Sequence, residues 1–530
     1  MHDLLGLELV VVLGAAVFLC GVGARRLGVP APVLLLLCGA LLGFVPALRQ
    51  VHLPPEAMLL IFLPALLFWE SLTTSLREIR SNLRAIVLLS TLLVIATAAA
   101  VAAAAHALGM PWGPAWVLGA ALAPTDATAV GVLARALPRR TVTTLRAESL
   151  VNDGTALVVY GLAVGTTVGE DSFTTPHVAG LFLLSYGGGA VVGVLTALAA
   201  LAVRRRLDDP LLESVAILLV PFTAYLLAEL VTASGVLAVV VCGLILSQAG
   251  PRIAHPGTRQ QTLPFWALST FLLNGALFVL VGLEVQAAVR GLTSVDVTRG
   301  LVAVAVVSAV VIGARFAWLF TTPYVIRVLD RRPQQRLRRV GARARVVSAV
   351  AGFRGAVSLA AALAVPETLA TGEPFPGRDL IVFVVTGVIV VTLGQALLLP
   401  RVVRWARLPR DTSVDEERHL AEVTAAEEAL AALPRLAADL GTDPAVLDRT
   451  VAEYEDHLRV LHADGDGDDD AAALRRDRDH TALRLAVLAH KRATVLRLRD
   501  ERRIDDTVLR QVQARLDIEE VRLGRVESVE

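Results

Sequence analysis

The sequence is poor in charged residues and almost devoid of lysine. Only 19% of its 530 residues are charged, whereas 55% are hydrophobic. A soluble chain of this length would form several domains with ordinary charged surfaces, so the composition argues against that class. Lys491 is the only lysine, and no G-x-x-x-x-G-K-[ST] motif surrounds it. We therefore do not expect this polypeptide to hydrolyse ATP through a P-loop.

Cysteine is scarce as well. Cys20, Cys38 and Cys242 lie singly in separate apolar runs, which fits neither the spacing of a metal site nor a disulfide framework. We interpret them as packing residues. No basic patch is interleaved with aromatic residues, so the sequence also argues against a nucleic-acid partner.

The net charge of +1 hides two parts of opposite sign. Residues 1–400 carry 28 Arg and 20 Asp plus Glu, whereas residues 401–530 carry 22 Lys plus Arg and 29 Asp plus Glu. From about residue 412, strings such as EERHLAEVTAAEEALAAL combine helical apolar spacing with charge pairs four residues apart. We predict a transmembrane domain over 1–405 and a charged, helical cytoplasmic tail over 406–530.

The tail contains an acidic string, HADGDGDDD, which resembles the start of a calcium-binding loop. The twelfth loop position counted from Asp464 is Arg475, where such a loop needs Glu. We therefore interpret the string as an acidic linker.

Long apolar runs dominate the rest of the chain. A membrane-spanning helix needs about 20 mostly apolar residues. Thirteen such runs lie at about 4–24, 30–48, 55–72, 84–107, 113–136, 146–168, 178–203, 211–231, 235–249, 264–286, 300–324, 346–366 and 379–400. The sequence predicts an all-α polytopic membrane protein with about 13 transmembrane helices. No basic residue precedes the first run, so we expect no cleaved signal peptide there.

The loop charges predict the orientation in the membrane. Alternate loops hold 22 arginines, and the opposite set holds only four. Because positively charged loops remain in the cytoplasm, we expect the N-terminus outside, the tail inside, and the protein in the cytoplasmic membrane. The odd number of spans agrees with this orientation.

The fifth run contains a proline and polar residues at mid-membrane depth. Pro124 removes a helix hydrogen bond, and Thr125 and Asp126 place polar groups beside the freed carbonyls. An unwound, oxygen-lined point suits a cation site. A simple proline kink, with Asp126 capping a half-helix, is an equally good interpretation of this run alone.

The sixth run carries the densest cluster of polar residues. Glu148 and Asn152 are one helical turn apart, and Ser149 and Asp153 are stacked on the adjacent strip. A charge at mid-membrane costs at least ~2.5–3.5 kcal/mol on insertion scales. A single aspartate could belong to a buried ion pair, but this cluster favours a function.

The eleventh and twelfth runs contain arginines. Arg354 lies between Gly352 and Gly355, and Arg315 lies in the string GARFAWLF. Each arginine needs an acidic partner, and the intramembrane acids available are Glu148, Asp126 and Glu229. The interruptions in runs five and twelve are seven spans apart, so their helices run in opposite directions. Runs 1–6 and 8–13 can therefore form an inverted repeat with a midplane substrate site.

Six ordered motifs in residues 5–405 resemble the monovalent cation:proton antiporters, in the branch that contains eukaryotic sodium/proton exchangers and their bacterial relatives. The motifs are APTDATAV (123–130), ESLVNDGTALV (148–158), SGVLAVVVCGLILS (234–247), FLLNGALFVLVGLE (271–284), GFRGAVSLA (352–360) and VTLGQALLLPRVV (391–403). The resemblance implies an inverted-repeat antiporter fold with broken crossing helices. It also implies a dimerisation domain, a mobile core domain and a homodimer.

The resemblance implies a site for Na⁺ and protons. Asp153 is then the carboxylate that binds either ion, and Thr125 and Ser149 add oxygen ligands. Asp126 neutralises the helix ends where runs five and twelve cross. The family usually reads L-P-x-L-L-F-E in its third helix, whereas this chain has LPALLFWES. Trp69 thus takes the expected place of the acid, and Glu70 follows one residue later.

The resemblance also implies a structural ion pair. Glu148 forms it with Arg315 as the first choice of partner and Arg354 as the second, and Asn152 braces the pair. The Asn-Asp sequence implies electroneutral exchange, because related electrogenic antiporters carry Asp where this chain has Asn152.

We therefore predict a secondary antiporter, not an enzyme, which exchanges Na⁺ for H⁺ by alternating access and serves pH and sodium homeostasis. Li⁺ and K⁺ remain open as alternative cations, because their ligands are the same oxygens. Burial favours the protonated form of a carboxylic acid, and a nearby cation favours the ionised form. Either a proton or a cation can therefore neutralise the charge of the same carboxylate.

We expect no cofactor beyond the transported ions, and we expect membrane lipid to surround the protein. The alternatives are an intramembrane hydrolase, whose motifs are absent from the runs, and a cation channel.

Overall fold

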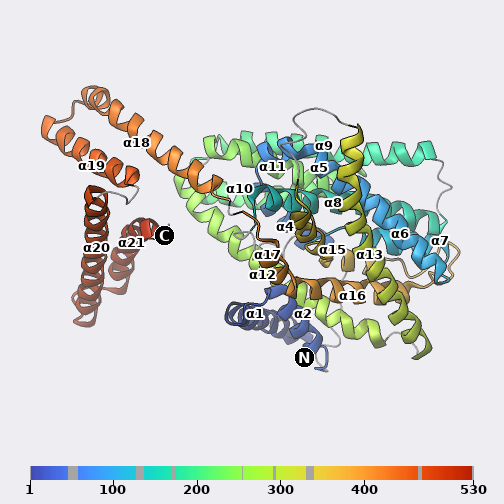
Figure 1. Cartoon of the computed structure of the whole chain (residues 1–530). Coiled ribbons are helices and arrows are strands. Elements are labelled where there is room, and N and C mark those ends of the chain that lie inside the picture. The colour runs from blue at the N-terminus through green and yellow to red at the C-terminus, as the bar shows by residue number, and fades with distance from the viewer. Residues whose placement is uncertain are drawn as a thin grey trace. The chain divides into compact units, whose positions relative to one another are not determined.

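The computed structural model describes residues 2–45, 58–126, 137–169, 175–253, 255–290, 294–329, 340–409, 411–463 and 468–527. These residues form helices joined by short connections (Figure 1). The chain divides into two compact units, Met1–Arg410 and Asp411–Glu530. The first unit contains all 13 apolar runs, and the second contains the charged tail.

The helices of the first unit pack as two groups. One group brings together helices that pack most extensively on one another around α11 and α12. Its members are α1 (His2–Leu27), α2 (Ala31–Leu42), the π-helix η2 (Met58–Phe62), α4 (Leu63–Thr73), α9 (Thr175–Arg204), α10 (Pro210–Leu230), α11 (Gly235–Ile253) and α12 (Pro256–Arg290). We call it the scaffold group.

The other group, which we call the core group, is built around α7, α8 and α16. Its members are α5 (Leu76–Val87), the π-helix η3 (Leu88–Leu92), α6 (Leu93–Ala107), α7 (Trp112–Leu122), α8 (Arg139–Val168), α13 (Ser294–Leu329), α14 (Ala342–Val350), α15 (Ala356–Leu363), α16 (Arg378–Gly394), the 3₁₀-helix η6 (Gln395–Leu397) and α17 (Leu399–Ala406). Runs four to six and eleven to thirteen thus fall in one group, as an inverted repeat requires.

Each of the 13 predicted runs contains helical residues, although parts of three runs lie outside the described residues, at 46–57 and 127–136. Seven helices in the described ranges are long and apolar enough to cross a membrane, and three shorter apolar helices accompany them. Helices α7, α8, α14 and α15 are not in that set. Helix α8 carries charged side chains, and α7, α14 and α15 are short because helical structure is interrupted after α7 and between α14 and α15. The polytopic, all-helical class is confirmed, and the number of 13 spans stays a prediction.

Close helix packing in the first unit depends on glycine. A Cβ on Gly39 would lie 2.0 Å from Val279 O, and one on Gly282 would lie 2.3 Å from Leu36 O. Helices α2 and α12 therefore approach each other to a distance that only glycine allows. Small residues give such contacts in membranes, where the lipid is as apolar as the side chains.

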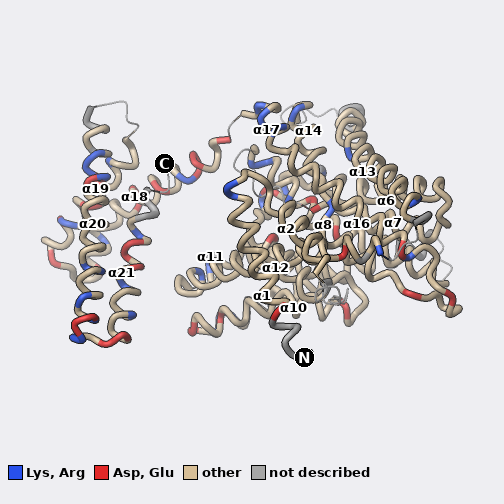
Figure 2. The backbone as a smooth tube through the Cα atoms, turned by 90° about the horizontal axis from the view of Figure 1, so that it is seen from below, with Lys and Arg blue, Asp and Glu red and all other residues tan. Residues whose placement is uncertain are grey.

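The second unit consists of α18 (Ser413–Leu440), α19 (Pro444–His462), α20 (Asp468–Asp500) and α21 (Asp506–Glu527). Acidic and basic residues alternate along these helices, whereas most of the first unit is uncharged (Figure 2). Arg492 on α20 forms ion pairs with Asp517 and Glu520 on α21. The prediction of a helical tail is confirmed for the described residues, whereas residues 464–467 of the predicted acidic linker lie outside them.

Candidate functional site

Two interruptions of helical structure, which we call breaks, meet inside the core group. Helix α7 ends at Leu122, and residues Pro124 and Thr125 continue without helical structure to Asp126. The second break separates α14 from α15. The two breaks are joined by an isolated antiparallel bridge, in which Asp126 N–H donates to Phe353 O at 2.9 Å. The interruptions predicted in runs five and twelve therefore cross each other.

Two of the helix ends at this crossing face a side chain of opposite charge. Arg354, 1% exposed, donates from Nε to Leu122 O at 2.9 Å, at the C-terminal end of α7. The Asp126 carboxylate lies against Gly355, the N-cap of α15, where an added Cβ would be 1.9 Å from Oδ2. The partial charges of a helix end favour such an arrangement. Gly355 is therefore required for the close approach of Asp126.

The Glu148–Arg315 ion pair lies beside the crossing. Arg315 Nη1 donates to Glu148 Oε1 at 2.5 Å and Nη2 donates to Oε2 at 3.1 Å, with both side chains at most 3% exposed. Gly352 leaves room for the guanidinium, because a Cβ there would lie 2.4 Å from Arg315 Nε. Arg315, the first choice of partner, thus bonds to Glu148. The second choice, Arg354, bonds to backbone carbonyls instead.

Asn152 supports this pair through Thr125. Its amide donates to Thr125 Oγ1 at 2.8 Å and to Thr125 O at 3.3 Å. Thr125 Oγ1 in turn donates to Glu148 Oε1 at 3.2 Å. Asn152 thus reaches the ion pair indirectly, because the hydroxyl of Thr125 lies between them.

A cavity of about 250 Å³ opens between the two helix groups. The core group contributes Thr125, Asp126, Ser149 and Asp153 to its lining, and the scaffold group contributes Glu70. Ser149 is 6% and Asp153 is 8% exposed. The cavity therefore collects the predicted ion-binding residues, whereas Glu148, Asn152, Arg315 and Arg354 do not line it.

The shifted acid of the third run also reaches this cavity. Both Trp69 and Glu70 are among its lining residues, so a displacement by one position leaves Glu70 on the cavity wall. A displacement by one residue rotates a helical side chain by about 100°. The cavity wall on α4 is wide enough to include both positions.

Sequence reasoning missed five polar residues of the cavity wall: Thr73, Arg146, Thr270, Asn274 and Ser358. Arg146 is one of the 22 arginines assigned to the predicted cytoplasmic loops. Its spacing to Ser149 and Asp153 nevertheless places all three residues on one face of α8. Asn274 and Ser358 lie in motifs that carry the family resemblance but show no charge. Ser358 is 1% exposed, and its Oγ has no hydrogen-bond partner among the described residues.

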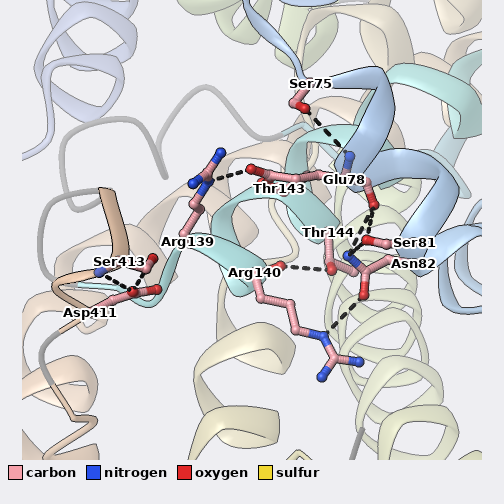
Figure 3. A network of polar contacts seen from close by, with 10 residues as sticks. All are labelled: Ser75, Glu78, Ser81, Asn82, Arg139, Arg140, Thr143, Thr144, Asp411 and Ser413. Atoms are coloured by element: carbon pink, nitrogen blue, oxygen red, sulfur yellow. Dashed lines mark hydrogen bonds and ion pairs between the residues drawn. The ribbon is translucent and has the colours of Figure 1, made fainter. Parts of the chain in front are cut away.

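A separate polar network attaches α5 to the start of α8 (Figure 3). Glu78 forms an ion pair with Arg139 and accepts a hydrogen bond from Thr143, and Arg140 Nε donates to Asn82 Oδ1 at 3.0 Å. Ser75 Oγ accepts from the N–H of Glu78 and caps α5. Helix α5 is therefore held to the core group rather than to the neighbouring α4.

Removal of one member of the buried ion pair should destabilise the protein. Glu148→Gln leaves the Arg315 charge uncompensated, so we expect a loss of about 3–5 kcal/mol. The double variant Glu148→Gln/Arg315→Gln should lose less than either single variant. Thermal unfolding of purified protein measures these effects. As a control, Arg449→Gln breaks the exposed Arg449–Glu453 pair and should change stability by less than about 0.5 kcal/mol. Additive losses in the Glu148→Gln/Arg315→Gln variant would contradict the pairing of Glu148 with Arg315.

Comparison with known proteins identifies relatives along most of the chain. The family model "Sodium/hydrogen exchanger, transmembrane" matches residues 12–405. An uncharacterized Na(+)/H(+) exchanger from Mycobacterium bovis is 46% identical over 521 residues, which cover 98% of this chain and 96% of the relative. The Na(+)/H(+) antiporter ApNhaP from Aphanothece halophytica is 32% identical over 408 residues, or 76% and 74% of the two chains.

A solved structure has the same fold. The sodium proton antiporter MjNhaP1 from Methanocaldococcus jannaschii superposes with a TM-score of 0.57 at 20% sequence identity. The match covers 76% of this chain and 98% of the other. Together with the family model, which covers the crossing, the ion pair and the cavity, these relatives show that the chain belongs to the transmembrane sodium/hydrogen exchanger family.

Proposed function

We propose that the protein is a secondary antiporter that exchanges Na⁺ for H⁺ at Asp153. One observation carries the proposal. The Asp153 carboxylate faces a cavity between two helix groups, and no described residue forms a hydrogen bond or ion pair with it. Family membership favours this function over the hydrolase and channel alternatives. The proposal needs no resident cofactor, because Na⁺ and H⁺ are the substrates.

Two other buried charges near Asp153 have partners. Arg315 neutralises Glu148, and the end of α15 lies against Asp126. Asp153 is therefore the group whose charge an incoming ion can cancel. Desolvation opposes movement of a bare carboxylate through a dry barrier, so the core group moves only when Na⁺ or H⁺ is bound. Ser149, Thr125 and Asp126 supply further oxygens around the ion.

The cavity extends from Asp153 toward the first turns of α8, through Ser149 and Arg146. The arginine-rich loops support a cytoplasmic location for this end of α8. The structure then corresponds to an inward-open state in the cytoplasmic membrane. We further propose that the scaffold group forms the contact of a homodimer, while the core group carries the ion across.

Asp153→Asn should abolish Na⁺/H⁺ exchange but leave a folded, membrane-inserted protein, because the amide keeps the volume and loses the titrating group. Dequenching of a pH-sensitive dye in inverted vesicles, scanned with Na⁺, Li⁺ and K⁺, measures the exchange. Asp208→Asn is the matched control, because Asp208 is exposed and is not among the residues that line the cavity. Exchange above one-tenth of the wild-type rate in Asp153→Asn would remove Asp153 from this role.

Exchange by the wild-type protein should not respond to the membrane potential. One Na⁺ and one H⁺ alternate on one carboxylate, and Asn152 cannot titrate, so no net charge crosses the membrane in a cycle. Clamping the potential with valinomycin and matched K⁺, at constant pH gradient, should leave the rate unchanged. Asn152→Asp should impair transport, because it removes the amide that donates to Thr125. A clear potential dependence in wild-type liposomes would refute the 1:1 stoichiometry.

Ser358→Ala should raise the KM for Na⁺ about fivefold to tenfold, or about 1–1.4 kcal/mol, with little change in kcat. The unpaired Oγ in the cavity wall is then a ligand of the ion or of its water. Ser308→Ala is the matched control, because Ser308 Oγ on α13 is also buried and unpaired but is not part of the cavity wall. Equal effects of the two substitutions on KM would show that Ser358 acts only through packing.

A further inference from the structure

Four arginines surround a hollow at the end of the first unit, outside the ion-binding cavity. Arg343 on α14, Arg401 and Arg404 on α17, and Arg407 after α17 line a space of about 570 Å³ together with Trp405. The Arg343 guanidinium lies 5.9 Å from the centre of the Trp405 ring. Figure 2 shows basic segments on the neighbouring helices α14 and α17.

The sequence of α17 turns these side chains outward. Leu399, Val403 and Ala406 are buried, and they recur at the spacing of one helix face. Arg401 and Arg404 lie on the exposed side, and Trp405 is 56% exposed. The short helix therefore presents two arginines and an indole on its open face.

The position of α17 places this hollow at a membrane surface. It follows directly after the apolar segment Arg378–Leu397, which has 20 residues. A helix of that length extends about 30 Å, the thickness of the hydrocarbon core. The arginines thus lie at the depth of the lipid headgroups, where tryptophan is also enriched.

The four arginines have no acidic partner among the residues that the structure describes. Arg401 Nη1 and Arg404 Nε reach only carbonyl oxygens of their own helix, at 3.5 Å and 3.4 Å. Arg492 in the tail differs, because two carboxylates flank it. A cluster of four positive charges without a counter-ion attracts an anion from outside the chain.

Arg407 provides a second observation. It ends α17 in the left-handed region, with φ of 45°. Glycine is favoured at such a position, because other residues are strained there. Arg407 nevertheless occupies this position, and its side chain is one of the four guanidinium groups that line the hollow.

We propose that this arginine hollow binds the phosphate of an anionic phospholipid headgroup. Guanidinium groups match the geometry of phosphate oxygens, and Trp405 packs on the adjoining glycerol and acyl region. The acidic tail of the chain is the other available anion. It would leave the exposed indole without an apolar partner, so the location and the tryptophan favour lipid.

The test uses the full-length protein in detergent, titrated with phosphatidylglycerol or phosphatidylcholine and followed by native mass spectrometry and thermal unfolding. Wild type should bind phosphatidylglycerol at least fivefold more tightly than phosphatidylcholine. Arg343→Gln/Arg401→Gln/Arg404→Gln should lose this preference. Arg407→Gly should reduce it while unfolding in phosphatidylcholine at the wild-type temperature or above.

The matched control removes three exposed arginines elsewhere, in Arg25→Gln/Arg26→Gln/Arg206→Gln, and should keep the preference. An equal loss in this control would show general electrostatic attraction and overturn the proposal. Full competition by millimolar inorganic phosphate would assign the hollow to a free anion instead. A loss of stability in the first triple variant that is equal in both lipids would indicate pairing with the acidic tail.

Discussion

The crossing of two broken helices is the constraint on which the rest of the core group depends. Each break leaves backbone groups without helical partners, in surroundings where water cannot satisfy them. Arg354 bonds to the end of α7, and Asp126 lies at the start of α15. Phe353, Gly352 and Gly355 are then fixed by the bridge and by the space that these two side chains require.

In the exchange that we propose, this arrangement separates the structural charges from the charge that binds the transported ions. Glu148 and Arg315 neutralise each other, and Thr125 and Asn152 hold the pair to the first break. The helices that carry these groups also hold α5, through Glu78 and Arg139. In that proposed exchange the core group moves as one body, and Asp153 is the group whose charge state changes.

The sequence predicted the charged residues of this site, because a charged side chain inside a membrane costs free energy. Charges within apolar runs located the crossing, the ion pair and Asp153, because packing alone does not explain them. It could not predict that Arg354 bonds to carbonyls, since only carboxylates were considered as its partners. Ser358 gave no signal, because an uncharged serine is common in membrane helices, and the indirect contact of Asn152 depends on tertiary geometry.

The displaced acid of α4 and a basic residue of α8 meet at the cavity. The acid of α4 is displaced to Glu70, and Arg146 lies on the same face of α8 as Asp153. Both line the cavity, together with Asp126 and Asp153. The start of α15 lies against Asp126, and Arg146 adds one positive charge to a cavity wall that holds three acidic residues. In the exchange that we propose, Asp153 is the one of these three acids that binds the cation and the proton in turn.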